Sequence, residues 1–181
     1  MRETLFRACI RFERSRETNS ESTIDVYTSI ADMTEPLVPK LPCACASSRR
    51  ASRALTQLYE EALRPLGIRA TQFTILQALS LTGEVSQGEL GRVLALDSTT
   101  LTRTLEIMIW KGWIVRRDGK DRRERRLRLG KAGKTQLMRA TPHWERVQAR
   151  LRRQFGTETW DNLLRVTNEV TQVVIDEGGL L

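Results

Sequence analysis

Apolar residues recur every three to four positions over much of this chain, which is the spacing of an amphipathic helix. The pattern predicts a first helix from Arg49, ended by Pro65 and Gly67. A second helix is predicted from about Thr71, and Gly83 closes it. Regular structure is therefore expected to begin with two helices joined by a short loop.

Two shorter helices are predicted next. Ser86 and Glu89 have the spacing of a capping box, in which the serine hydroxyl and the glutamate carboxylate satisfy each other's helix-end amides. Asp97 or Ser98 caps a fourth helix, whose apolar side chains begin at Leu101. A three-residue turn joins these two helices, so the segment predicts a helix-turn-helix.

A β-hairpin is predicted after the fourth helix. Residues 113–115 and the alternating Leu127 and Leu129 indicate two strands, with a turn at 118–121 between them. Because arginines alternate with these leucines, the arginines are expected on the opposite face of the strand. A hairpin after a helix-turn-helix makes the motif winged.

Helical spacing returns in the last third of the chain. One helix is predicted over 131–154, where Pro142 is expected to kink or divide it, and another over 157–176. The fold class that follows is mainly α with a small β-wing.

The N-terminal stretch has a different character. Residues 1–42 are rich in Arg, Glu, Ser, Thr and then Pro without a sustained apolar period, so we expect them to be largely disordered. The segment that begins at Met33 looks like the ordinary beginning of a protein chain. This gives the hypothesis that 1–32 is an upstream extension produced by a misassigned start. The intact mass of the native protein would decide it.

Positive charge is concentrated in the hairpin. Residues 116–134 contain ten Lys and Arg against three Asp and Glu, a net +7, whereas the whole 181-residue chain carries +8. Basic side chains that neutralise phosphates release condensed counterions, so a polyanion is the expected partner and a membrane surface the alternative. No apolar run has the length of a membrane span and no signal-peptide core is visible, so we expect a cytoplasmic protein without a membrane role.

The start of the fourth helix is a candidate for reading DNA. Hydroxyl groups and an arginine at that end can reach base edges in the major groove, and the free amides of the helix start attract phosphate. The candidate residues are Ser98, Thr99, Thr100, Thr102 and Arg103. The alternative is that the hydroxyl groups merely cap the helix.

The hairpin tip is a second candidate for DNA contact. Arg123, braced by the carboxylate of Asp121, is predicted to enter a narrow minor groove. The other side chains predicted to hold backbone phosphates or to pair with acidic groups are Lys120, Arg122, Arg125 and Arg126. The alternative for each of them is a solvated charge.

Three stretches of the chain resemble the multiple-antibiotic-resistance (MarR) family of winged-helix transcription regulators. They are 70–76 in the second helix, 96–103 in the fourth and 118–129 in the hairpin, and the resemblance covers about 45–176. It implies a homodimer in which the first helix and the last two intertwine, leaving two lobes to straddle successive major grooves of a pseudo-palindromic DNA operator.

The same resemblance implies an organisation within the chain. The DNA-binding lobe would span about 68–130, and the dimerisation helices about 47–64 and 131–176. Recognition-helix contacts would come from 98–103, and the minor-groove contact from Arg123.

Two features depart from the family pattern. Gly130 replaces the threonine that usually follows the second wing strand, which leaves the cap of the next helix open. Trp110 and Trp113 flank Lys-Gly where smaller charged or aliphatic residues are usual, and we expect both to pack rather than to stack on a ligand.

Family members are commonly repressors released by a small aromatic ligand or by cysteine oxidation, so the resemblance implies an unidentified small-molecule or oxidant effector. Cys43 and Cys45 precede the first helix, where helix-start amides and the neighbouring Arg49 and Arg50 favour the reactive thiolate. The alternative is a pair of ordinary surface cysteines. We expect no metal and no cofactor, because the single histidine, His143, lies far from both in sequence.

A small-molecule effector would use the pocket that the fold offers between the dimerisation helices and the winged lobe. The candidates to line it are Tyr59, Phe73, Trp110 and Trp144. Aromatic residues at helical spacing are more often core, which is the alternative.

The favoured function is a sequence-specific DNA-binding regulator, with a dimeric repressor as its expected form. One alternative is a winged-helix module that binds protein or RNA. The other is a cysteine-dependent enzyme, for which neither Cys43 nor Cys45 has an evident base. The sequence contains no glycine-rich phosphate loop, no serine-centred elbow and no clustered carboxylates.

Overall fold

The structure is a computed structural model that describes residues 42–118 and 125–176. The chain divides into two units, and all the described residues belong to the unit formed by 41–181. Two predictions therefore lie outside the described residues. One is the disorder of 1–42, apart from Pro42, and the other is the set of tip contacts from Lys120, Asp121, Arg122 and Arg123.

Helices dominate the described residues. In chain order the elements are α2 (Ala44–Leu63), the 3-10 helix η3 (Arg64–Leu66), α3 (Ala70–Thr82), β1 (Val85–Ser86), α4 (Gln87–Leu94), α5 (Ser98–Trp110), β2 (Ile114–Asp118), β3 (Arg125–Leu129), α6 (Lys131–Phe155) and α7 (Thr157–Asp176). The predicted fold class, mainly α with a small β-wing, is confirmed.

The predicted helix-turn-helix is formed by α4 and α5. The capping box at the start of α4 is confirmed, because the Ser86 backbone amide donates to Glu89 Oε2 at 2.7 Å and the Glu89 amide donates to Ser86 Oγ at 3.2 Å. Ala95 opens the three-residue turn in the left-handed region, at φ 49°, which ends α4 and redirects the chain into α5.

The hairpin belongs to a three-stranded antiparallel sheet of order β1-β3-β2. The prediction contained two strands and missed β1, which pairs Val85 with Leu127 and Ser86 with Arg126. A two-residue strand is too short to show alternation, and Ser86 is at the same time the N-cap of α4. The third strand therefore became visible only through its pairing.

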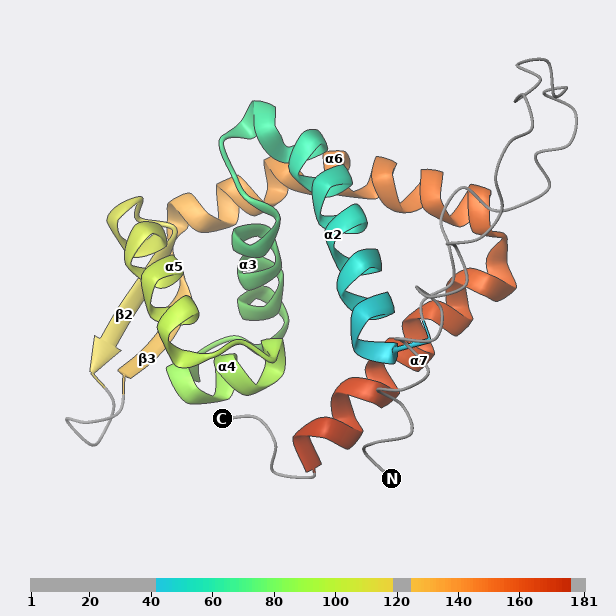
Figure 1. The fold of residues 1–181 in the computed structure, drawn as a ribbon. Helices are drawn as coiled ribbons and strands as arrows, with labels where there is room; N and C mark the ends of the chain where they lie inside the picture. The colour runs from blue at the N-terminus through green and yellow to red at the C-terminus, as the bar shows by residue number, and fades with distance from the viewer. Residues whose placement is uncertain (1–41, 119–124, 177–181) are drawn as a thin grey trace, which may run out of the picture. The chain divides into compact units, whose positions relative to one another are not determined.

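One core joins the helices of the lobe to the sheet. Phe73 of α3, Leu90 of α4, Leu101 of α5 and Leu127 of β3 are all at most 2% exposed and belong to one buried cluster. Figure 1 shows α3, α4 and α5 grouped beside the β2–β3 hairpin, with α6 leading away from the sheet past α2 to α7. The core thus fixes α5 and the hairpin as neighbours.

Helix α6 runs unbroken through Pro142, so of the two expected effects of this proline, a kink or a division, the division is wrong. Tertiary packing holds both halves: Ala140 on the N-terminal side belongs to the lobe core, and Val147 and Leu151 on the other side pack with Trp160 of α7. The burial on each side outweighs the loss of one backbone hydrogen bond at the proline.

Two backbone segments approach each other closely at Gly130, which explains why this position is a glycine. Its amide donates to the Trp113 carbonyl at 2.8 Å, and a Cβ at this position would overlap the Gly112 carbonyl oxygen. Three residues on, a Cβ at Gly133 would overlap the Trp113 carbonyl oxygen. The usual threonine has no room here, and α6 accordingly starts without a side-chain cap.

Candidate nucleic-acid interface

The start of α5 is held by Asp97 and presents a polar surface. Asp97 Oδ1 accepts a hydrogen bond from the Thr100 amide at 2.9 Å, and hydrogen bonds from Thr100 lower the pKa of the Asp97 carboxyl. Ser98, Thr99 and Thr100 are all exposed. This turn therefore offers hydroxyl groups and helix-start amides to a ligand.

Thr102 and Arg103 follow on the same helix, with different surroundings. The Thr102 hydroxyl donates to the Ser98 carbonyl at 2.7 Å and accepts from Gln87 Nε2 of α4 at 2.8 Å. Arg103 is exposed, and no hydrogen bond or ion pair joins its guanidinium to the residues that the structure describes. Arg103 is thus available to an external acceptor, whereas the Thr102 hydroxyl connects the two helices.

No sequence pattern singles out Gln87, because its role depends on a partner fifteen positions away. It is the first residue of α4, so its side chain leaves the helix start toward α5. The nearest signal in the sequence was the capping box, which places Gln87 directly after the N-cap.

The described part of the hairpin carries three exposed arginines, Arg116 and Arg117 on β2 and Arg125 on β3. Arg126 is different: its Nε lies 3.3 Å from Glu84 Oε1, and its Nη2 donates to the Glu84 carbonyl at 3.1 Å. Arg126 was predicted either to contact phosphate or to pair with an acidic group, and in the structure it pairs with Glu84. Arg116 and Arg117 contribute to the predicted charge of the hairpin but were not among the predicted contact residues.

A cleft of about 830 Å³ lies between the lobe and the long helices. Tyr59, Phe73 and Trp144 line it, as the sequence predicted for the pocket residues, with the Phe73 and Trp144 rings 6.0 Å apart between centroids. Gln148 Nε2 donates to the Tyr59 hydroxyl at 2.9 Å, and burial raises the pKa of Tyr59. Helix α7 adds an apolar wall that includes Leu163 and Val166.

Trp110 does not line this cleft. Its side chain is 85% exposed at the end of α5, so the expectation that it packs is wrong. Trp113 does pack, at 9% exposure, and the Lys111 ammonium lies 4.4 Å from the centre of its ring. The chain reverses at Gly112, so the two neighbouring tryptophans have opposite environments.

Cys43 and Cys45 are free, exposed thiols at the start of α2. They share a shallow depression with Arg49, Arg50 and Arg53, so the predicted arginine neighbours are present together with a third. Among the described residues no cluster of His, Cys, Asp and Glu could hold a metal ion. His143 lies instead against the Ala62 carbonyl, with its Nδ1 3.2 Å from the oxygen.

Comparison with known proteins gives a consistent set of similarities. A family model described as the MarR family matches residues 66–124. The crystal structure of the M. tuberculosis transcriptional regulator MosR in complex with DNA is 36% identical, with a TM-score of 0.67 over 74% of this chain and 97% of that one. A mutant E. coli MarR complexed with operator DNA is 23% identical over 70% of this chain and 91% of that one, with a TM-score of 0.64, which shows the fold alone.

Curated relatives match over shorter lengths. The uncharacterized HTH-type transcriptional regulator YwoH of Bacillus subtilis is 32% identical over 82 residues, which are 45% of this chain and 60% of YwoH. The multiple antibiotic resistance protein MarR of Salmonella typhimurium is 42% identical over 60 residues, 33% of this chain and 42% of that protein. The matches therefore span about half the length of these relatives. Among the described residues, no helix is both long and apolar enough to cross a membrane.

Proposed function

This chain belongs to the MarR family, and we propose that it is a sequence-specific, DNA-binding transcriptional regulator. The observation that carries the proposal is the start of α5, the second helix of a helix-turn-helix, where exposed hydroxyl groups lie beside Arg103, which has no partner among the described residues. A recognition helix places its N-terminal side chains against base edges in the major groove. The DNA complex of MosR supports the same class of ligand for this chain.

The hairpin supplies the second part of the proposed interface. Arg116, Arg117 and Arg125 are exposed beside α5 and would hold backbone phosphates. The minor-groove contact by Arg123, braced by Asp121, remains a prediction, as do phosphate contacts from Lys120 and Arg122. These contacts would supply affinity and salt dependence, whereas α5 would supply sequence discrimination.

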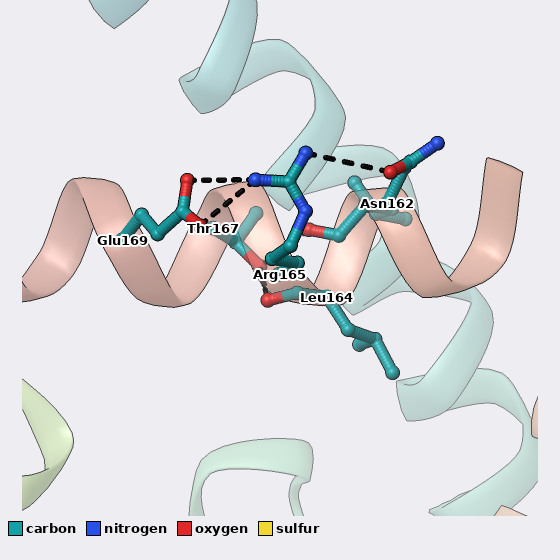
Figure 2. Close-up of polar contacts among 6 residues, drawn as sticks. Asn162, Leu164, Arg165, Thr167 and Glu169 are labelled. Atoms are coloured by element: carbon teal, nitrogen blue, oxygen red, sulfur yellow. Dashed lines mark hydrogen bonds and ion pairs between the residues drawn. The ribbon is translucent and has the colours of Figure 1, made fainter.

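The proposed form is a homodimer on a pseudo-palindromic operator. Helix α7 supports it, because a 20-residue helix buries only Trp160 among its own residues and leaves valines such as Val170 and Val173 each 56% exposed. Figure 2 shows polar contacts along this helix, where Arg165 donates to Glu169 at 2.8 and 3.0 Å and to Asn162 at 3.4 Å. These polar side chains of α7 therefore bond to one another, and a second copy of the chain would cover the exposed valines.

The proposed output is repression, released by a signal. The cleft lined by Tyr59, Phe73 and Trp144 would accept a small aromatic molecule, because its surface is mainly apolar and hydroxyl groups along its walls could hold a polar substituent. Oxidation of Cys43 and Cys45 is the alternative input, supported by their exposure and their arginine neighbours.

Fluorescence anisotropy with labelled duplexes tests the proposal. The protein should bind a duplex from its own promoter region more tightly than a scrambled duplex, and the affinity should fall with salt at a log–log slope of magnitude about 0.9 per neutralised phosphate. Arg103→Ala should cost about 1–3 kcal/mol on the promoter duplex and less on the scrambled one. Arg139→Ala, at an exposed position of α6, is the matched control.

Equal affinity for both duplexes, or equal effects of the two substitutions, would contradict the proposal. A structured RNA that outcompetes the promoter duplex would favour the RNA-binding alternative. Family membership argues against the cysteine-dependent enzyme.

A further inference from the structure

A second cavity lies beside β3, between the end of α3 and residues of α6, and it shares no lining residue with the cleft at Tyr59. Its volume is about 610 Å³. Its walls come from the end of α3, from β3 and from α6, and include Leu79, Arg128, Lys134, Leu137 and Met138. Nothing in the proposed DNA interface uses these side chains.

Arg128 is the unusual residue of this cavity. Among the described residues, its Nε is the single buried side-chain nitrogen or oxygen that has no hydrogen-bond partner. No carboxylate in the described part of the chain lies within ion-pair distance of Arg128 or of Lys134. A buried donor of a charged group without an acceptor costs free energy, so the Nε of Arg128 lacks an acceptor among the described residues that its burial calls for.

Strand register explains why Arg128 is in this position. Leu127 and Leu129 are buried in the core, so Arg128 and Arg126 lie on the opposite face of β3. Glu84, directly before β1, also lines the cavity. Its carboxylate is already paired with Arg126, at 3.3 Å from the Arg126 Nε. Two cations therefore face one cavity whose single described carboxylate is engaged elsewhere.

We propose that this cavity binds a small organic carboxylate with an aliphatic body. The terminal nitrogens of the planar Arg128 guanidinium match a carboxylate with two parallel hydrogen bonds, and Lys134, an exposed residue of the same lining, adds a second positive charge. Leu79, Leu137 and Met138 provide an apolar wall for the hydrocarbon. Inorganic phosphate would meet the cations but leave these walls without a partner. The site shares no residue with the cleft at Tyr59 or with the proposed DNA contacts.

Isothermal titration calorimetry on the full chain at about pH 7, where a carboxylic acid is ionised, tests the site with hexanoate as the probe. Hexanoate should bind at least about tenfold more tightly than 1-hexanol or inorganic phosphate. Arg128→Met should weaken hexanoate binding by about tenfold or more, and Lys134→Met by a few-fold. Arg125→Met, three positions before Arg128 on the same strand and outside the lining of the cavity, should leave the hexanoate affinity unchanged.

Thermal melting separates a lost ligand contact from lost folding. Without ligand, Arg128→Met should melt no lower than the parent protein, because it removes an unsatisfied buried donor and keeps an unbranched side chain. Hexanoate should raise the melting temperature of the parent protein and not that of Arg128→Met.

Unchanged hexanoate affinity in Arg128→Met, phosphate binding as tight as hexanoate binding, or a marked fall in the melting temperature of Arg128→Met would each overturn the proposal. The last result would show that Arg128 has a structural partner.

Discussion

Thr102 and Arg103 are adjacent in the chain and were selected together as base contacts, yet their side chains have different relations to the molecule. The Thr102 hydroxyl is engaged twice, with the Ser98 carbonyl and with Gln87. Arg103 has no partner among the described residues. We therefore expect Thr102 to act mainly by positioning α5 on α4, and Arg103 to contact DNA directly.

A double-mutant cycle tests this difference. Thr102→Val and Gln87→Met should each weaken binding to the promoter duplex, and the double variant should be little worse than either, with a coupling energy of about 1 kcal/mol. The cycle is measured by anisotropy, with Arg103→Ala in the Gln87→Met background as the additive control. If Thr102→Val costs the same with and without Gln87, the threonine contacts DNA directly.

The Asp97 cap gives a pH dependence with a defined sign. Hydrogen bonds from Thr100 lower the pKa of Asp97 below its ordinary 3.8, so the folded state favours the carboxylate. This contribution to stability is fully present above the ordinary pKa and is lost as the pH falls through the lower folded-state pKa.

Asp97→Asn is the matched variant, because asparagine also caps a helix but does not ionise. The melting temperature of the parent protein should exceed that of Asp97→Asn at about pH 7, and the difference should shrink as the pH falls to about 3. A difference that is constant over this range would assign the effect of the substitution to geometry rather than to charge.

At the scale of the elements, the junction between the sheet and α6 depends on two glycines that lack room for a side chain. Gly133 lies inside α6, where alanine would ordinarily favour the helix by about 1 kcal/mol. A Cβ there would instead overlap the Trp113 carbonyl oxygen, which belongs to backbone and cannot rotate away. Overlap should therefore outweigh helix propensity, and α6 would have to move from the sheet.

Gly133→Ala should accordingly lower the free energy of unfolding by about 1–3 kcal/mol or more. Gly88→Ala is the control, because a Cβ at this helical position of α4 meets nothing within 4 Å. The control should be neutral or stabilising in urea denaturation. Equal stability of the two variants would contradict the close packing of α6 on the sheet.

At the scale of the whole molecule, the exposed apolar face of α7 makes the chain look incomplete as a monomer. Val173 is 56% exposed and lies outside the lining of the cleft, so it reports on this face alone. A second copy that buries it would remove apolar surface from water, whereas a charge placed there would have to be buried without a partner.

Val173→Glu should shift the protein from dimer to monomer in analytical ultracentrifugation, and it should weaken binding to a two-half-site operator more than to a single half-site. Asn168→Glu, on the polar face of the same helix, should leave the dimer intact. A dimer that survives Val173→Glu would place the subunit contact elsewhere.

What the sequence determined by itself is the part of the molecule that depends on neighbours within a few positions. The helical periods, the Ser86–Glu89 capping box and the turn before Asp97 are local interactions, and the structure contains them. The concentration of arginines in the hairpin is likewise a property of composition. These features were enough for the fold class and for the family.

Tertiary structure decided whatever depends on partners distant in the chain. Strand β1 exists through its pairing with Leu127, and α6 passes Pro142 because both of its halves are packed. The hydrogen bond from Gln87 to Thr102 also depends on tertiary structure, as does the Arg128 Nε, which has no acceptor within the described part of the chain. Residue spacing reports local conformation, but whether a polar group finds a partner depends on which distant atoms the folded chain brings within hydrogen-bond distance.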